Sequence, residues 1–437
     1  MVLKLYNTIS RKKEVFKPVH KEEVRMYVCG PTVNDIPHLG HARSQISFDI
    51  LRRYLIYLGY KVKFVSNVTD IEDKIINKAN ELGIGIDVLT KRNFEAHKKD
   101  YSSLGVLKPD VQPFATKYVQ QMIDLIKKLE SKGYTYTLED GVYYNISKFK
   151  DYGKLSKQKL EGLRVGNRIK DKKNNDFVLW KFSKPGEPSW DSPWGKGRPG
   201  WHIECSAMSE SILGLPLDIH GGGQDLIFPH HEDEIAQSEA AYGKELANYW
   251  VHNGMVNVDN VKMSKSLGNF KSIKDLLEEY SGNVIRYLVI SNHYRKPLDF
   301  SKDSLSLSQN SYNRLKNLVL EIEDDGKENK EYLKEFEEAM DDDLNTPRAL
   351  QVLWKLARDK NAQGRLGTIK KIEEVFNMGL LEREELEIPL EIKDLAEKRE
   401  QARASKDWNL ADKLRAEISK RGYSVEDSKD GWKIKKI

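Results

Sequence analysis

The side chains best suited to chemistry on phosphate begin with two histidines three residues apart, His38 and His41. They flank Leu39 and Gly40 at the predicted start of a helix, where free backbone N–H groups and the helix dipole favour a bound anion. Gly40 lets a flat ring pack against the backbone. Nucleotidyl transfer needs positioning and charge neutralisation more than covalent catalysis. The pair therefore indicates a phosphate site, although two histidines on a surface loop explain it about equally well when it is taken alone.

Two lysines, Lys262 and Lys265, are also three residues apart, and Ser264 and Ser266 lie beside them. This pattern predicts a mobile loop that carries positive charge to a pyrophosphate. An ordinary basic turn is the commoner explanation of an isolated lysine pair. The order of the two strings and the distance between them make chance a poor explanation, so each supports the other.

A third group of residues has the chemistry of a metal site. His230 and Glu234 are four residues apart in a predicted helix, so that both side chains lie on one face. The only two cysteines of the chain, Cys29 and Cys205, complete a set of S, N and O donors that zinc accepts. A solvated acidic helix with incidental histidines is the alternative. Because both cysteines lie beside glycine-rich or aromatic segments, we favour the metal site.

The composition fits a soluble protein of several domains. With 437 residues the chain is too long for one core, and two to four domains are expected. No apolar run is long enough to span a membrane, and the N-terminus lacks the apolar core of a signal peptide, so a cytoplasmic protein is expected. The net charge of +5 permits an anionic partner without proving one.

The elements around the histidines predict a parallel sheet. Residues 24–29 indicate a strand, 41–58 an amphipathic helix and 61–68 a second strand. Strand, turn, helix and strand form a βαβ unit, whose strands are parallel. The two histidines then lie at the carboxyl end of the first strand, where ligands bind in open α/β sheets.

The rest of the chain changes character several times. Residues 117–131 predict a helix, about 148–200 a basic, loop-rich insertion, and 201–250 a return to α/β character. From about Ser304 the pattern is helical. The tail from about residue 390 predicts two helices that divide near Asp407, a candidate cap, followed by two short strands. The fold class is therefore α/β, with a Rossmann-like parallel-sheet catalytic domain that carries an insertion, a helical bundle and a small C-terminal α+β domain.

Over nearly its whole length the chain resembles the cysteinyl-tRNA synthetases, which are class I aminoacyl-tRNA synthetases. The histidine and lysine strings correspond to the two class I signatures, which many synthetases share, and the metal set is more specific. Leu39 replaces a commoner isoleucine, and the chain is rather short. The resemblance covers residues 27–33, 37–43, 67–71, 201–208, 218–239, 262–269, 340–347 and 403–415.

The resemblance implies one Zn²⁺ per chain, bound by Cys29, Cys205, His230 and Glu234, that takes the thiolate of the substrate cysteine as a further ligand. Thiolate is a soft ligand that zinc prefers to a hydroxyl, which separates cysteine from serine. By the same resemblance the cysteine pocket is lined by Gly30, Thr69, Trp201, His220 and Asp225. ATP is held by His38, Gly40, His41 and Lys265.

The implied reaction has two steps. L-cysteine and ATP, with Mg²⁺, give cysteinyl-adenylate and pyrophosphate, while His38, His41, Lys262 and Lys265 stabilise the developing charge. Cysteine then passes to the 3′ end of tRNA(Cys). The protein is expected to act as a monomer without a membrane partner, and Arg399, Arg403 and Trp408 are candidate anticodon contacts, although a charged helix surface is the commoner explanation for any one of them.

The expected domains follow the resemblance. The expectation is a catalytic first half at 1–116, a connective insertion at 117–200, a catalytic second half at 201–250, a stem-contact region with the lysine loop at 251–303, a helical bundle on the anticodon side at 304–388, and an anticodon-binding domain at 389–437.

Three other functions compete with the ligase. A paralogue that gives cysteine to an amino sugar, as in mycothiol synthesis, shares the zinc and ATP motifs but does not usually carry such a tail. A non-catalytic RNA-binding protein on the same scaffold often loses motif residues, which are intact here. In a third alternative the zinc only stabilises the fold.

Overall fold

The protein is described by a computed structural model that covers residues 2–21, 23–158, 176–259, 261–262, 271–383, 389–428 and 431–436. The chain divides into two compact units, Met1–Leu380 and Leu381–Ile437. Among the residues covered, every helix is too short or too polar to cross a bilayer.

The first unit contains a four-stranded parallel sheet in the order β10-β9-β3-β4. In register, Met26 lies beside Ile219, and Ala247 beside Leu217. The strands β9 and β10 are buried almost throughout, and β3 and β4 are buried over their C-terminal halves, as expected for parallel strands covered on both faces. The predicted parallel sheet is confirmed. Its strands are β3 (Glu23–Val28), β4 (Lys61–Ser66), β9 (Leu217–Gly223) and β10 (Ala247–Asn253).

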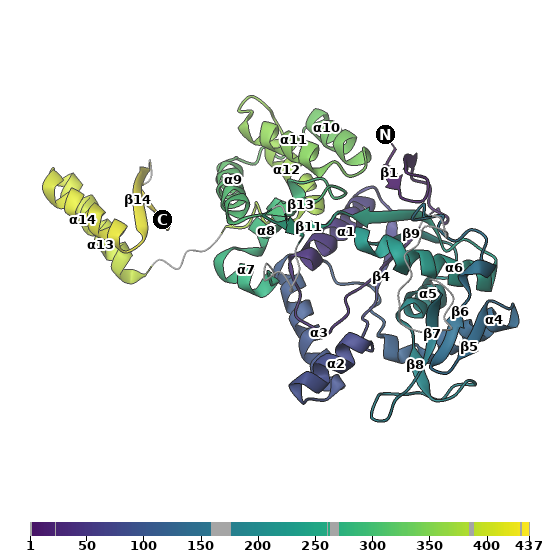
Figure 1. The fold of residues 1–437 in the computed structure, drawn as a ribbon. Coiled ribbons are helices and arrows are strands. Elements are labelled where there is room, and N and C mark those ends of the chain that lie inside the picture. The colour runs from purple at the N-terminus through teal and green to yellow at the C-terminus, as the bar shows by residue number, and fades with distance from the viewer. Residues whose placement is uncertain are drawn as a thin grey trace. The chain divides into compact units, whose positions relative to one another are not determined.

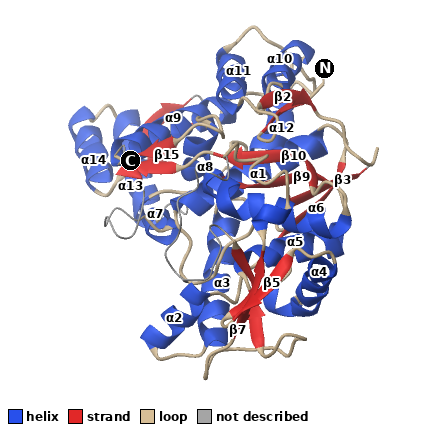
Figure 2. Cartoon of the chain, turned by 45° about the vertical axis from the view of Figure 1, so that its right-hand side comes forward, coloured by secondary structure: helices blue, strands red, loops and turns tan. Residues whose placement is uncertain are grey.

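Two crossover helices make a switch point in this sheet. The helix α1 (Leu39–Tyr57) connects β3 to β4, and α6 (Glu232–Tyr242) connects β9 to β10. Because the two crossovers lead outwards in opposite directions, the strand order reverses between the adjacent strands β3 and β9. Ligands bind at such points, beyond the carboxyl ends of the strands. Figure 2 shows α1 beside β9 and β10 in the middle of this unit.

The region between β4 and β9 has a sheet of its own. Its antiparallel strands have the order β5-β6-β7-β8 and share one apolar core with α5 and α6, which includes Trp180, Ile203 and Ile235. The strands β7 and β8 lie where the composition indicated loops, because the buried side chains between the turns were too few to mark strands. The elements of this region are α2 (Asp73–Leu82), α3 (Ile86–Ser103), α4 (Val119–Ser131), β5 (Thr135–Leu138), β6 (Gly141–Tyr144), β7 (Phe177–Phe182), β8 (Gly197–Pro199) and α5 (Trp201–Leu213).

The remainder of the first unit is mostly helical, as expected beyond Ser304, and Leu315, Leu353 and Leu356 are buried. Two small sheets flank it, the hairpin β1 (Lys4–Asn7) and β2 (Lys12–Val15), and the sheet β12-β11-β13. The other elements are β11 (Val256–Val258), β12 (Val261–Lys262), α7 (Ile273–Glu279), α8 (Gly282–Ile290), β13 (Leu298–Phe300), α9 (Lys302–Leu320), α10 (Lys330–Asp341), α11 (Thr346–Arg358) and α12 (Arg365–Phe376). Figure 1 shows α9 to α12 gathered into a bundle.

The second unit pairs two helices with a hairpin. The helices α13 (Leu390–Ala404) and α14 (Trp408–Lys420) precede the antiparallel strands β14 (Tyr423–Ser428) and β15 (Gly431–Lys436). The side chain of Asp407 accepts a hydrogen bond from the Leu410 amide and caps α14, as predicted. The core contains Ile392, Ile418 and Val425. The two helices and two strands predicted for the tail are confirmed.

Candidate active site and metal-ligating cluster

The two histidines of the first motif cap α1. His38 is the N-cap residue, and its Nδ1 accepts a hydrogen bond from the Gly40 amide at 3.0 Å. Nδ1 of His41 accepts from the His38 amide at 3.1 Å. Each Nδ1 must therefore be unprotonated, so a neutral ring carries its proton on Nε2. Any ligand of these rings is met by an Nε2–H donor.

Both rings are neutral near pH 7. Burial lowers the pKa of His38 to about 4, although the charge of Asp225 opposes the shift. Burial also lowers the pKa of His41 well below its usual value, and His38 and His97 add to the effect. The two rings therefore present neutral hydrogen-bond donors at a helix start rather than cations.

The proposed metal ligands form one compact cluster. The thiol sulfur atoms of Cys29 and Cys205 are 3.6 Å apart, and Cys29 Sγ lies 3.4 Å from Glu234 Oε1. Nε2 of His230 lies 3.1 Å from the same carboxylate oxygen. One donor atom from each of the four residues lies within 4.8 Å of all the others. Two thiols, an imidazole and a carboxylate at this spacing suit a tetrahedral zinc ion.

Four different elements bring these ligands together. Cys29 directly follows β3, Cys205 lies on α5, and Glu234 lies in the first turn of α6. His230 lies in the kinked segment Ile227–His231 just before α6, in which Phe228 is extended, so that the expected four-residue pairing with Glu234 is formed across a helix junction. Burial raises the pKa of the Cys29 thiol and lowers the pKa of His230. A metal cation bound to the thiol would instead lower the pKa of the thiol and favour the thiolate.

Gly30 is required beside the first cysteine by a close approach of two backbones. A Cβ atom at this position would lie only 1.6 Å from the Asn67 carbonyl oxygen. The Gly30 amide also donates to the side chain of Asn67 at 2.8 Å. The loop after β3 is thereby held against the loop after β4, which fixes Cys29 at the edge of the sheet.

A buried layer of aromatic and imidazole rings lies behind the cluster. Nε2 of His220 is 2.8 Å from Glu234 Oε2, and the His220 ring stacks on Trp250 at 4.6 Å. His231 lies 3.3 Å from Cys29 Sγ through Nε2 and 2.8 Å from His252 through Nδ1. A second set of four donor atoms also has metal-ligating spacing, but it contains one thiol, whereas the first set contains two. Its members are Cys29, His220, His231 and Glu234. Nothing in the residue spacing indicated His231 as a neighbour of the thiol.

Through Cys29 the cluster borders a cleft of about 450 Å³ that also contains the histidine motif, whereas Cys205, His230 and Glu234 are buried. Of the residues expected in the cysteine pocket, Gly30, Trp201 and Asp225 line this cleft together with Cys29. Thr69 and His220 are buried behind it. Thr69 donates a hydrogen bond to Glu204 at 2.7 Å, and His220 contacts Glu234. Neither side chain is among the residues that line the cleft, so each contacts a buried carboxylate instead.

The lysine motif is only partly covered. The backbone of Lys262 lies in β12, which pairs with β11 beside the cleft residue Val256. Lys265 lies outside the described residues, as do Ser264 and Ser266.

Several cleft residues carried no signal in the sequence. Lys74, in the first turn of α2, brings a further cation into the cleft, but no motif surrounds it. The other lining residues that the sequence did not indicate are Asn34, Asp35, Ile36, Ser44, Gln45, Asn253, Gly254, Met255 and Val256.

Comparison with known proteins places the chain in a family. Residues 15–310 match the model of the tRNA synthetases class I (C) catalytic domain, 335–379 the DALR domain, and 386–433 the cysteinyl-tRNA ligase anticodon binding domain. The cysteine–tRNA ligase of Thermococcus gammatolerans is 47% identical over the whole length of both chains. The chain belongs to the cysteine–tRNA ligase family. The cysteine–tRNA ligase of Vibrio atlanticus is 46% identical over 99% of this chain and 100% of its own.

Solved structures show the class I synthetase fold. A Mycobacterium tuberculosis methionyl-tRNA synthetase in complex with methionyl-adenylate superposes with a TM-score of 0.61 at 15% identity, over 82% of this chain and 91% of the other. The leucyl enzyme LeuRS of Agrobacterium radiobacter, in a ternary complex with tRNA, has a TM-score of 0.62 at 11% identity, over 84% of both chains. At these identities the likeness establishes the fold alone, and the expected fold class is confirmed.

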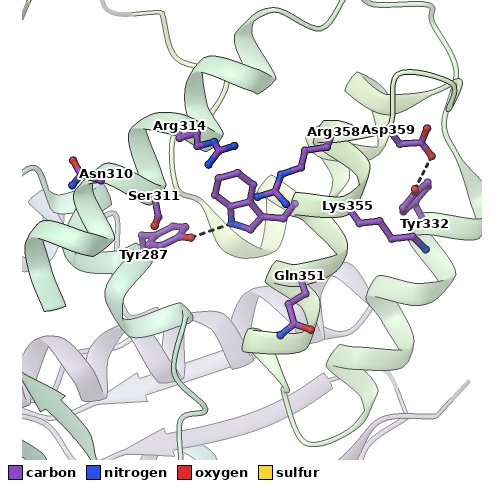
Figure 3. Close-up of a pocket in the computed structure, with 10 residues that line it drawn as sticks. Tyr287, Asn310, Ser311, Arg314, Tyr332, Gln351, Lys355, Arg358 and Asp359 are labelled. Atoms are coloured by element: carbon purple, nitrogen blue, oxygen red, sulfur yellow. Dashed lines mark hydrogen bonds between the residues drawn. The ribbon is translucent and has the colours of Figure 1, made fainter.

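A wider pocket of about 880 Å³ lies in the helical bundle and shares no lining residue with the cleft. Figure 3 shows Arg314, Lys355 and Arg358 around it. Two of these cations are already engaged, because Lys355 pairs with Glu335 at 3.0 Å and Arg358 lies over the Trp354 ring at 4.4 Å. The pocket therefore offers less free positive charge than its composition indicates.

The candidate anticodon contacts differ in their surroundings. Arg399 is buried and makes two hydrogen bonds with Asp427, at 2.9 and 3.3 Å. Arg403 contacts the same carboxylate at 2.9 Å. Trp408 is 58% exposed at the start of α14. Trp408 is thus accessible to a partner, whereas Arg399 holds α13 against β14.

Proposed function

We propose that the protein activates L-cysteine with ATP and transfers it to the 3′ end of a cysteine tRNA. The observation that carries this proposal is the position of Cys29, which belongs to the thiol–imidazole–carboxylate cluster and lines the same cleft as the His38 and His41 motif. A ligand in this cleft meets a sulfur-selective site at one end and a phosphate-binding helix start at the other.

In the first step the cysteine carboxylate attacks the α-phosphate of ATP. A bond forms between a carboxylate oxygen and the α-phosphorus, the bond to the β-phosphate oxygen breaks, and pyrophosphate leaves with the electron pair. The Nε2–H groups of His38 and His41 donate hydrogen bonds to the phosphate oxygens, whose charge grows in the transition state. Lys262 and Lys265 supply positive charge to the same phosphates, and Mg²⁺ accompanies ATP.

We propose that Cys29, Cys205, His230 and Glu234 hold one zinc ion. Zinc bound there would keep the substrate thiol deprotonated and select sulfur over the hydroxyl of serine. Glu234 is oriented for this task by His220, and Cys29 is fixed by the loop contacts of Gly30. Trp201 and Asp225 bound the rest of the amino-acid pocket.

In the second step a terminal ribose hydroxyl of tRNA attacks the carbonyl carbon of the adenylate. The new bond is an ester, the bond from the carbonyl carbon to the phosphate oxygen breaks, and AMP leaves with the electron pair, while the hydroxyl loses its proton.

We propose that residues 117–200 lie on the acceptor-end side, 251–303 contact the stem, and 304–388 with 389–437 reach towards the anticodon.

The decisive experiment is ATP–pyrophosphate exchange with each of the twenty amino acids, with wild type and with Cys205→Ser. Exchange with cysteine alone is expected, and the serine variant should lose at least 100-fold because the metal loses a ligand. Ser209→Ala, a buried serine on the same helix, is the matched control and should retain exchange. Folded, zinc-containing protein without exchange for any amino acid would refute the proposal.

The amino-sugar ligase is the second candidate that the experiment must separate. Both enzymes would catalyse cysteine-dependent exchange. Charging of a cysteine tRNA distinguishes them, since only the tRNA ligase gives an aminoacyl ester that is labile to mild base. The match of residues 386–433 to an anticodon binding domain supports the tRNA ligase.

A further inference from the structure

The first step of the proposed reaction brings two anions together. The carboxylate of cysteine must approach the α-phosphate of ATP, and like charges repel each other as the distance between them falls. A cation at the point where they meet would lower this barrier. His38 and His41 do not supply that charge, because burial lowers the pKa of both rings and leaves them neutral near pH 7.

The lining of the cleft is poor in cations. In the described part of the chain, Lys74 is the only lysine or arginine that lines it, beside the carboxylates of Asp35 and Asp225. The Lys74 side chain is exposed, and its ammonium group makes no hydrogen bond or ion pair with another described residue. An anion that enters the cleft therefore displaces no protein carboxylate from this cation.

The start of α2, where Lys74 lies, is fixed by the two preceding residues. The side chain of Glu72 caps the helix by accepting a hydrogen bond from the Lys74 amide at 2.8 Å. Asp73 contacts Lys181 Nζ at 2.9 and 2.8 Å and also binds Arg198, so that it is attached to the strands β7 and β8. This attachment holds the first turn of α2 at the wall of the cleft, although the Lys74 side chain itself remains free to adjust.

Lys74 enters the cleft at its amino-acid end. The segment that leads into α2 pairs with the loop after β3, since the Val33 amide donates to the Thr69 carbonyl oxygen at 3.1 Å. Asp73 and Trp201 line one small cavity together, so that the start of α2 lies close to Trp201. Trp201 and Lys74 both line the cleft, and the thiol of Cys29 lies at the same end.

We propose that the ammonium group of Lys74 contacts the carboxylate of the substrate cysteine and, as the bond to phosphorus forms, the non-bridging oxygens of the α-phosphate. The inference rests on the proposed function and adds a catalytic residue to it. Cysteine is short, so its carboxylate stays near the cluster that binds its thiol. The attacking and leaving oxygens lie in line across the phosphorus. Lys74 thus acts on the attacking side, and Lys262 and Lys265 on the side of the leaving pyrophosphate.

The first test measures cysteine-dependent ATP–pyrophosphate exchange without tRNA. Lys74→Met removes the ammonium group but keeps most of the aliphatic chain, and kcat should fall roughly 10- to 100-fold. Lys74→Arg keeps the charge and should stay within about fivefold of wild type. Lys78→Met, which removes an exposed ion pair with Glu81 one turn further along α2, is the matched control and should exchange at the wild-type rate.

A pair of ligands separates a contact with the carboxylate from a general disturbance of the cleft. L-cysteinol keeps the thiol and the amine of cysteine but has no carboxylate. In Lys74→Met, the dissociation constant of L-cysteine from the zinc-loaded protein should rise about fivefold, whereas that of L-cysteinol should stay within about twofold of wild type. Equal weakening of both ligands would show a structural role for Lys74 and overturn the proposal.

The remaining outcomes are also decisive. Unchanged exchange in Lys74→Met would overturn the proposal. If exchange is unchanged while single-turnover transfer of cysteine to tRNA falls, Lys74 contacts RNA and has no role in the first step. Absence of cysteine-dependent exchange in the wild-type protein would instead refute the proposed function, so the two failures are distinguishable.

Discussion

The thiol sulfur atoms of Cys29 and Cys205 lie 3.6 Å apart although 176 positions separate them in the chain. This distance is far longer than the roughly 2 Å of a disulfide bond. It is, however, of the order expected for two thiolates on one zinc ion, each at about 2.3 Å from the metal. The spacing of the two thiols therefore suits two ligands of one metal ion, and the predictions begin with this cluster.

The two neighbouring histidines should contribute differently to zinc binding. His230 belongs to the donor set with two thiols, whereas His231 belongs to the set with one. Because zinc favours sulfur, we expect His230→Asn to weaken zinc binding more than 100-fold and His231→Asn roughly tenfold, as for a residue outside the first coordination shell. Competition with a chromogenic chelator measures the zinc dissociation constants of both variants. A larger loss of zinc affinity in His231→Asn than in His230→Asn would instead show that His231 is the metal ligand.

Replacement of His97 should change the pH dependence of stability. The ring is 1% exposed between the Asp35 carbonyl oxygen, at 3.1 Å, and the Tyr101 hydroxyl, at 2.9 Å. Burial lowers the pKa of His97 to about 3, below the roughly 6.5 of an unfolded chain. The unfolded state therefore binds the proton first as the pH falls below about 6.5, and the folded state loses stability.

His97→Phe removes this contribution. Between pH 7 and pH 4.5 the free energy of unfolding of the variant should fall by about 2–3 kcal/mol less than that of wild type. Urea titrations at several pH values measure the difference. Parallel profiles for the two proteins would show that His97 is not a neutral buried group.

A buried arginine should be indispensable for the stability of the first unit. Arg286 donates to Asp49 at 2.5 Å, to the Phe376 carbonyl oxygen at 2.6 Å and to the Leu104 carbonyl oxygen at 3.2 Å. Arg286→Met removes one of the two cations that contact the buried Asp49 carboxylate and leaves two buried carbonyl oxygens without their donor, and we expect a loss of about 3–5 kcal/mol in the free energy of unfolding. Lys355→Met, which removes an exposed ion pair, should cost under about 1 kcal/mol. Denaturant unfolding measures the free energy of unfolding of both variants. Equal losses would show that the buried Arg286 contacts do not stabilise the first unit more than an exposed ion pair does.

Trp408 should contribute to tRNA binding through its exposed ring. Stacking on one base is worth about 1–3 kcal/mol, so Trp408→Ala should raise the KM for tRNA by roughly 5- to 100-fold. Cysteine-dependent exchange should not change, because Trp408 belongs to the second compact unit. Leu390→Ala, at another highly exposed apolar side chain of that unit, is the control. An unchanged KM would place the tRNA contacts elsewhere.

The sequence was most informative where the signal is local. The βαβ unit, the helical region after Ser304 and the two helices and two strands of the tail follow from periodicity and capping, which depend on residues a few positions apart. The bounds of α1 differ slightly from the predicted helix because the His38 side chain itself forms the cap. The strand β7 was missed because the surrounding turns and lysines masked a short apolar run.

By itself the sequence determined which atoms are available: two thiols, an imidazole and a carboxylate at helical spacing, and two histidines at a helix start. Only the tertiary structure decided which of them meet. It brought Cys29 to Cys205, placed His231 beside the thiol, and moved Thr69 and His220 behind the cleft. It also buried His38 and His41, which lowers the pKa of both rings. The reason is physical, because residue type and spacing fix local geometry, whereas burial and the contacts between distant strands depend on how the whole sheet packs.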